Sequence, residues 1–340
     1  MSPIGVVAWW AGLSQQARGT AISLAGILVL SPDTLCIRLV NGVDNWTVMF
    51  FRYLLQGLTM LFVFVCTEGT RAPGKMWSLG RLGCIAGLIW GASNILFTLA
   101  VQNTAVANVL VILAGGDLFF ATVLSYLILG EGVPPHTLVC CACCFAAILL
   151  TFSDQLQGGG AGITGNIYAI FASVTMAGYF VALRLASVQG RSLDMVPTNI
   201  IAGCFVGFIS LCFGARPGSV RPDLTCLCLV LQGVFLLPIA FGLLTIGPGL
   251  IPAPQVSMIM LIETILGPVW VALGGFEAPP ANTIYGGLIL IVSLIAHSTI
   301  SLRLEAAAKK AEHEAKVKEE EKEGENCEAV TLTLEEIKSC

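Results

Sequence analysis

The chain has 340 residues, of which 56% are hydrophobic and only 11% are charged. Soluble domains carry about 25% charged residues, so this composition excludes an ordinary soluble protein. Residues 1–302 contain ten basic and ten acidic side chains, whereas the tail 303–340 holds seven basic and eleven acidic ones. The sequence therefore predicts a protein that crosses the lipid bilayer many times and ends in a short charged tail in water.

The thirteen cysteines lie mostly inside apolar runs, and four of them gather at positions 140–144. Disulfide frameworks belong to small secreted domains, and no His, Asp or Glu stands among these four cysteines to complete a metal site. Small residues at this spacing are typical of packing in a membrane helix. We expect no metal, no cofactor and no nucleic-acid partner.

Apolar runs separated by Gly, Pro and Asn breaks are long enough to cross the hydrocarbon core, which takes about 20 residues. The predicted fold class is all-α integral membrane, with a short segment 1–19 before the first span. Ten spans are predicted, at 20–40, 46–66, 80–101, 106–129, 136–153, 164–186, 194–214, 224–246, 250–274 and 282–302.

An internal repeat organises these spans. Sliding the chain by 146 positions superimposes spans one to five on spans six to ten. Each half holds an odd number of spans, so the two halves are predicted to be inverted five-helix repeats, 20–153 and 164–302, joined by a Gly-rich linker, 154–163. Inverted repeats are typical of secondary transporters, whose substrate site lies near the midplane between the halves. Pairs that coincide at this offset include Arg38 with Arg184, Asp117 with Glu263, Glu131 with Glu277, Gly57 with Gly203 and Gly87 with Gly233.

The basic residues predict the orientation. Ten spans place both termini on one side, and that side receives thirteen Lys and Arg residues against two on the other. Because cytoplasmic loops carry the excess of basic residues, both termini are predicted to be cytoplasmic.

Three motifs resemble a known family. The ninth span and its following loop carry Glu263-x4-Pro268-x8-Glu277, and the first half carries Phe51-Arg52-Tyr53 and Leu127-Ile-Leu-Gly130-Glu131. These stretches resemble EamA-type proteins of the drug/metabolite transporter superfamily, over about residues 20–302. The resemblance implies ten helices, transport of small organic metabolites and no use of ATP, and it names no substrate. In span four the family usually has a proline at the place of Thr122, and this chain has Gly115-Gly116-Asp117 earlier in the span.

Charged residues inside the spans are the main candidates for a site. An ionisable residue at the bilayer centre costs on the order of 2.5–3.5 kcal/mol, so it normally faces the protein interior and has a task. Asp117 and Glu263 are central in spans four and nine, and the repeat places them at matched depth. Together they could attract a cationic or zwitterionic substrate, and one of them could take up a proton and couple transport to it. The alternative is that each hydrogen-bonds a neighbouring helix.

Asp33 follows Pro32, which interrupts the first span, and broken helices with polar residues are typical of transporter sites. Arg52 in span two is predicted either to contact substrate or to form an ion pair with Asp33 or Asp44. Arg38 is expected to anchor the first span at the membrane interface.

Three uncharged side chains complete the predicted substrate site. Asn94 lies in the middle of span three, Tyr179 is the repeat equivalent of Asp33, and Trp270 lies two turns after Glu263 on the same helix face. An aromatic ring near a carboxylate suits an organic cation or an amino acid. Glu277, at a span end beside proline, is expected to cap a helix or form a turn.

The predicted function is secondary-active transport of a small organic metabolite, most readily an amino acid or a related cationic or zwitterionic compound, by alternating access. The alternatives are a receptor or scaffold with the same helices that does not transport, and a sugar-conjugate exchanger of the same superfamily. An exchanger of phosphate-bearing compounds would favour intramembrane lysines, yet the only Lys before the tail is Lys75, in a loop. With no Ser/His/Asp set, metal cluster or phosphate loop, an enzyme is not expected.

Overall fold

The computed structural model describes residues 15–40, 42–130, 132–157, 162–189, 195–220, 223–246 and 253–304, with a few more positions up to 310. Glu131, the centre of the linker and most of the tail therefore lie outside the described residues. In order, the elements are α2 (Gln15–Leu30), α3 (Asp33–Leu39), α4 (Asn45–Glu68), η1 (Gly69–Arg71), α5 (Ala72–Ser78), α6 (Gly80–Asn103), α7 (Val106–Leu124), η2 (Ser125–Leu129), α8 (Pro135–Gln157), α9 (Ile163–Val188), α10 (Met195–Cys212), η3 (Pro217–Ser219), α11 (Leu224–Val230), η4 (Leu231–Leu236), α12 (Leu237–Ile246) and α13 (Ala253–Leu273). A last helix covers Ala281–Leu304.

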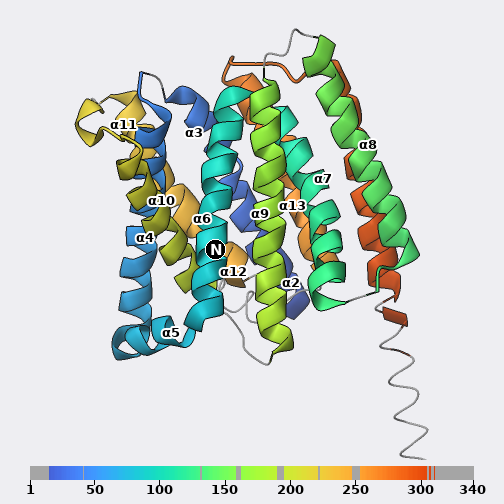
Figure 1. Cartoon of the computed structure of the whole chain (residues 1–340), viewed down its shortest axis with the longest axis horizontal. Helices are drawn as coiled ribbons and strands as arrows, with labels where there is room; N and C mark the ends of the chain where they lie inside the picture. Colours follow the sequence, from blue (N-terminus) through green and yellow to red (C-terminus); the bar gives the residue numbers. More distant parts are fainter. Residues whose placement is uncertain are drawn as a thin grey trace, which may run out of the picture.

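The described part of the chain is helical and contains no strand, and its helices run side by side as a bundle (Figure 1). Among the described residues, eight helices are long and apolar enough to cross a membrane, by length and composition. The predicted spans 194–214 and 250–274 coincide with shorter apolar helices, Val196–Cys212 and Ile259–Leu273. The prediction of an all-α membrane protein is confirmed, while the count of ten spans and the inverted repeat stay predictions.

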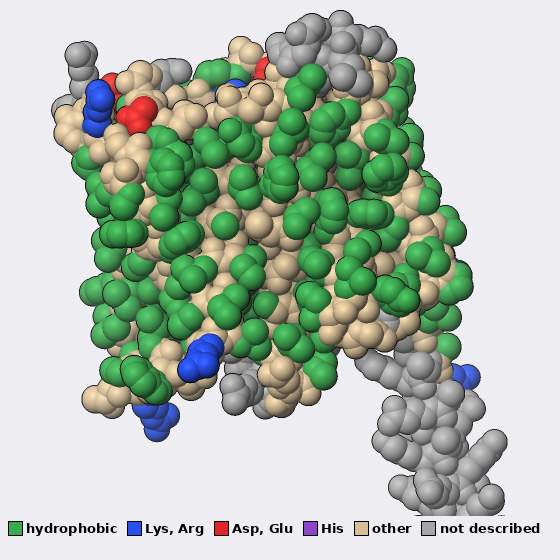
Figure 2. Space-filling model, in the orientation of Figure 1, with side chains coloured by type: hydrophobic (Ala, Val, Ile, Leu, Met, Phe, Trp, Pro, Cys, Tyr) green, Lys and Arg blue, Asp and Glu red, His purple; other side chains and the backbone are tan. Residues whose placement is uncertain are grey.

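The outer surface of the bundle suits a lipid environment. Hydrophobic side chains cover the middle of the face seen in Figure 2, and charged side chains gather at its two ends. Many large apolar side chains of the bundle are exposed, among them Phe62, Leu127 and Leu273. Soluble monomers rarely expose contiguous apolar patches of this extent, so lipid is the expected neighbour. The protein is a multi-pass membrane protein.

Two kinds of irregularity interrupt the helices. Pro32 lacks a backbone N–H, and the first span accordingly divides into α2 and α3 around Ser31 and Pro32, as predicted. The segments η2 and η4 are π-helical turns that continue α7 and α11. By contrast, α7 runs unbroken through Gly115 and Gly116.

Two glycines allow α4 and α10 to pack backbone against backbone. A Cβ on Gly203 would lie 2.6 Å from the carbonyl oxygen of Tyr53 and 2.8 Å from the Cα of Gly57. A Cβ on Gly57 would in turn lie 3.2 Å from the Cα of Gly203. Small residues at helix interfaces permit such close approach in membranes. The contact therefore holds together one helix from each half of the chain.

The variant Gly203→Ala is expected to lose stability, by about 1–3 kcal/mol, because its methyl group overlaps the α4 backbone. The matched control is Gly242→Ala in α12, where a Cβ would meet nothing within 4 Å. That variant is expected to gain about 0.4–1 kcal/mol, since alanine restricts the unfolded chain. Thermal unfolding of both purified proteins in one detergent measures the difference, and equal melting temperatures would contradict the close contact.

Candidate functional site

The centre of the site is a buried ion pair between the first two spans. Nη2 of Arg52 lies 2.5 Å from Oδ2 of Asp33, and the two side chains are only 2% and 5% exposed. Asp33 is the first residue of α3, so the helix break at Pro32 places its carboxylate inside the bundle. Asp44 instead caps α4, accepting from the backbone N–H of Thr47 at 3.0 Å. The predicted ion pair of Arg52 is confirmed, with Asp33 as its partner.

Gln232 joins this pair from the other half of the chain. Its Nε2 donates to the carbonyl oxygen and to Oδ1 of Asp33, both at 3.0 Å. Gln232 lies on the π-helical turn η4, and such turns are frequent at functional sites. The next residue, Gly233, lets this turn approach α4, since a Cβ there would lie 2.9 Å from the carbonyl oxygen of Arg52. Both carboxylate oxygens of Asp33 are thus bonded to described residues.

Glu263 approaches the pair from α13. Its half-buried carboxylate lies close enough to Asp33 and Arg52 to interact electrostatically with both. Farther along α13, Nε1 of Trp270 donates to the hydroxyl of Ser31, at the break between α2 and α3, at 2.9 Å. The structure therefore brings four predicted residues, Asp33, Arg52, Glu263 and Trp270, to the broken first span.

Asp117 forms no hydrogen bond with the ion pair among the described residues. It lies on α7, and its Oδ1 is buried with no hydrogen-bond partner among the described residues. The helices α7 and α13 do pack together, through Val111 and Leu261. However, no hydrogen bond or electrostatic interaction links Asp117 to Glu263 in the described part of the chain. That the two acids line one cavity stays a prediction.

Asn94 and Tyr179 take part in hydrogen bonds away from Asp33. The carbonyl oxygen of Asn94 accepts from the hydroxyl of Tyr53 at 3.1 Å, and Nδ2 of Asn94 is buried with no partner among the described residues. The hydroxyl of Tyr179 lies 3.0 Å from that of Thr198, and its ring lies 4.8 Å from the ring of Trp90. Tyr179 thus belongs to an aromatic cluster on α6, α9 and α12 that also includes Trp90 and Phe241.

A second ion pair lies at the end of α3. Nη2 of Arg38 contacts both carboxylate oxygens of Glu277, at 3.1 and 3.2 Å, and also the carbonyl oxygen of Thr104 at 2.6 Å. Oε1 of Glu277 accepts from the N–H of Val106, the first residue of α7, at 2.7 Å. The expected capping role of Glu277 is confirmed, on a helix 171 positions away. Arg38, expected as an interface anchor, pairs with this carboxylate.

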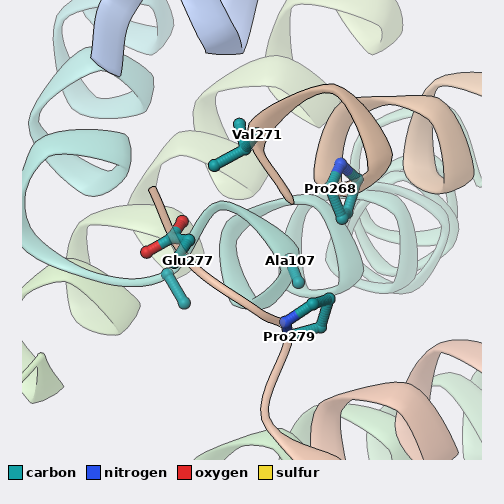
Figure 3. Close-up of a pocket in the computed structure, with 6 residues that line it drawn as sticks. Ala107, Pro268, Val271, Glu277 and Pro279 are labelled. Atoms are coloured by element: carbon teal, nitrogen blue, oxygen red, sulfur yellow. The ribbon is translucent and has the colours of Figure 1, made fainter. Parts of the chain in front are cut away.

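The local chain path explains the position of Glu277. Gly275 adopts φ 76°, and the N–H of Phe276 donates to the carbonyl of Val271 at 3.3 Å, so α13 ends in a left-handed glycine turn. The extended segment that follows carries the Glu277 carboxylate to the start of α7, as Figure 3 shows. The narrow pocket beside it is lined by Ala105, Ala107, Pro268, Val271, Glu277 and Pro279.

Comparison with known families bears on the first half of the chain. Residues 17–153 match the family model described as the EamA-like transporter family. This segment is EamA-like. The EamA family belongs to the drug/metabolite transporter superfamily, so the predicted resemblance is confirmed here. The EamA-like segment contains Asp33, Arg52, Asn94 and Asp117.

The fold also resembles a solved structure titled "Crystal structure of protein". The two share 19% sequence identity and a TM-score of 0.56, over 83% of this chain and 98% of the other. At this identity the likeness concerns the fold alone, and it extends well beyond the EamA-like segment. No curated protein matches the chain.

Proposed function

We propose that this protein is a secondary-active transporter of a small organic metabolite, and that it works by alternating access rather than as an enzyme. The observation that carries the proposal is the cluster of Asp33, Arg52 and Gln232, which are buried, with Glu263, which is half-buried. Its first two members belong to the first half and its last two to the second half. Charges are costly inside a membrane protein and normally mark the path of a substrate or ion.

The charges of this cluster favour an amino acid or a related cationic or zwitterionic compound. Asp33 and Arg52 neutralise each other, which leaves the carboxylate of Glu263 to attract an ammonium group. Nε and Nη1 of Arg52 are buried and have no hydrogen-bond partner among the described residues. Hydrogen bonds from a guanidinium to a carboxylate are charge-assisted and strong, so these two donors suit the acidic end of an amino acid.

The other predicted site residues contribute to substrate binding and passage outside the ion pair. Trp270, held by Ser31, offers an aromatic surface for an organic cation. Asp117, Asn94 and Tyr179 line the route of the substrate through the bundle. A proton taken up by Glu263 when the substrate leaves couples transport to a proton gradient.

The two halves are proposed to be inverted five-helix repeats of ten helices in all. Under the offset of 146 positions, Gly57 is equivalent to Gly203, and these two glycines contact each other directly. A residue meets its own equivalent only close to the axis that relates two copies. This contact therefore supports a pseudo-two-fold axis that passes between α4 and α10.

Reciprocal contacts elsewhere support the same axis. A Cβ on Gly87 would lie 2.9 Å from the Cβ of Ile201. At the offset of 146 positions, Gly87 corresponds to Gly233 and Ile201 to Leu55. A Cβ on Gly233 would lie 2.7 Å from the Cβ of Leu55. Reciprocal contacts of this kind are expected between two copies related by a two-fold axis, so they support the proposed repeat.

The ion pair itself has a counterpart in the second half. Asp33 and Arg52 are equivalent to Tyr179 and Thr198, and both pairs are joined through their side chains. The hydroxyl pair occupies the place of the charged pair, so the two repeats share a contact and differ in its chemistry. The charged pair then lies in one repeat only, which suits an asymmetric substrate.

Both termini are proposed to be cytoplasmic. The basic residues expected on that side include Lys75 of α5, and Figure 1 shows α5 at the end of the bundle opposite α3. We expect protease added outside sealed cells to leave the tail intact, and protease added after permeabilisation to remove it. Digestion of the tail from outside would reverse the proposed orientation.

The proposed function is tested with the purified chain in sealed vesicles. Radiolabelled amino acids, organic cations and sugar conjugates are offered singly, with and without an inside-acidic proton gradient. Uptake of an amino acid above empty vesicles, stimulated by the gradient, is the expected result. Saturable binding without uptake would favour a receptor, and exchange of sugar conjugates would favour the exchanger.

A further inference from the structure

The ion pair of Arg38 and Glu277 joins the two halves of the chain at one end of the bundle. We call the contacts among Arg38, Thr104, Val106 and Glu277 the latch. Three of these residues belong to the first half, and Glu277 alone represents the second half, 239 positions from Arg38. Every hydrogen bond of the latch that joins the two halves is accepted by the Glu277 carboxylate. Loss of this carboxylate therefore breaks all of these bonds.

The latch is built to open more easily than the central ion pair. The side chains of Arg38 and Glu277 are 21% and 28% exposed, whereas those of Arg52 and Asp33 are almost fully buried. Partly exposed charges can exchange a protein partner for water at little cost, while a buried pair cannot. The N-cap of α7, Ala105, offers no side-chain bond of its own, so only Glu277 among the described residues caps this helix.

The short helix α3 connects the latch to the central cluster, which is formed by Asp33, Arg52, Gln232 and Glu263. It has seven residues, with Asp33 at its first position and Arg38 in its last turn. At 1.5 Å per residue the two side chains leave the helix about 7.5 Å apart along its axis. Because the break at Pro32 separates α3 from α2, α3 can tilt as a unit. A tilt that changes the contacts of Asp33 must also move Arg38 relative to Glu277.

We propose that the latch holds this end of the protein closed, and that its release opens the central cluster to the adjoining side of the membrane. The inference rests on the proposed alternating access, and it assigns α3 as the element that links the substrate site to the closure. With both termini cytoplasmic, the closed end is the outer one.

The experiment measures a distance across the latch in the full chain. Spin labels are attached to bio-orthogonal amino acids at Asn103 and Ala278, two exposed positions beside the latch on opposite halves, so that the native cysteines stay in place. In lipid vesicles the unchanged protein is expected to give one short distance. Glu277→Gln and Arg38→Gln are expected to add a longer distance, populated at several times the wild-type fraction. Arg38→Lys is expected to populate the longer distance more than the wild type and less than these two variants.

The matched control is Glu68→Gln, which removes an exposed ion pair with Lys75 inside the first half. It is expected to leave the distance unchanged. A distance distribution that stays the same in Glu277→Gln, Arg38→Gln and Arg38→Lys would overturn the latch. If Glu277→Gln does not fold, the milder Arg38→Lys variant still decides. The measurement needs no substrate, so failure to find transport in vesicles would leave its result standing and would count against the proposed function alone.

Discussion

Uptake by the Glu263→Gln variant is expected to fall about ten- to hundredfold. A hydrogen bond to a charged group contributes about 1.5–3 kcal/mol, and each 1.4 kcal/mol is a factor of ten in binding. Glutamine keeps the shape of the side chain and removes its charge, so the fold should persist while the ammonium group of the substrate loses its partner. Because glutamine takes up no proton, the uptake that remains is expected to be the same at every pH.

Initial uptake rates in proteoliposomes across a series of pH values measure both effects. The control variant is Asp223→Asn, which removes the charge of an exposed carboxylate at the start of α11, where asparagine also caps the helix. This control is expected to transport normally. Wild-type rates for Glu263→Gln at every pH would remove Glu263 from the mechanism.

The variant Asp117→Asn tests whether Asp117 belongs to the same substrate site as Glu263. If Asp117 and Glu263 share one cavity, the Asp117→Asn variant should also lose most of its uptake. Normal uptake by Asp117→Asn with loss in Glu263→Gln would confine the site to the cluster around Asp33 and Arg52.

Features that depend on single residues could be read from the sequence. Pro32 removes one backbone donor, so a break in the first span was predictable, and α2 and α3 meet there. The high cost of an isolated charge in the membrane made a partner for Arg52 predictable, and Asp33 supplies it. Apolar length alone located the eight helices of the described residues that are long enough to span a membrane.

Features that depend on which helices are neighbours could not be read in the same way. Gln232 binds Asp33 across 199 positions, and the latch joins residues 239 positions apart. The signal for Gln232 was nonetheless present, as a polar amide within Leu224–Leu244, the most apolar span at a mean hydropathy of 2.4. A polar side chain in such a run needs a partner inside the protein, and a search for its partner would have led to the site.

Tyr179 shows the limit of reasoning from the repeat. Its equivalence to Asp33 predicted a role in the substrate site, and this role stays a prediction. In the structure Tyr179 contacts Thr198 and Trp90. An offset along the sequence does not tell which side chains these neighbours are, because they come from other helices.

The single variants Asp33→Asn and Arg52→Gln are each expected to destabilise the protein by about 3 kcal/mol, because each leaves one buried charge without its partner. The double variant is expected to recover most of this loss, since two neutral amides can hydrogen-bond each other and Gln232. Thermal unfolding in detergent gives the change in the free energy of unfolding for each single variant and for the double variant. The coupling energy of the pair is the change in the double variant minus the sum of the two single changes. Glu68→Gln, which breaks the exposed pair with Lys75, is the control and is expected to cost less than about 1 kcal/mol.

The same three proteins separate stability from transport. If the ion pair only supports the fold, the double variant should regain uptake together with stability. If Arg52 also binds the carboxylate of the substrate, the double variant should be stable and inactive, since glutamine offers neither the charge nor the donors at Nε and Nη1. We expect the second outcome. A stable double variant that transports amino acids at the wild-type rate would show that Arg52 serves the fold alone.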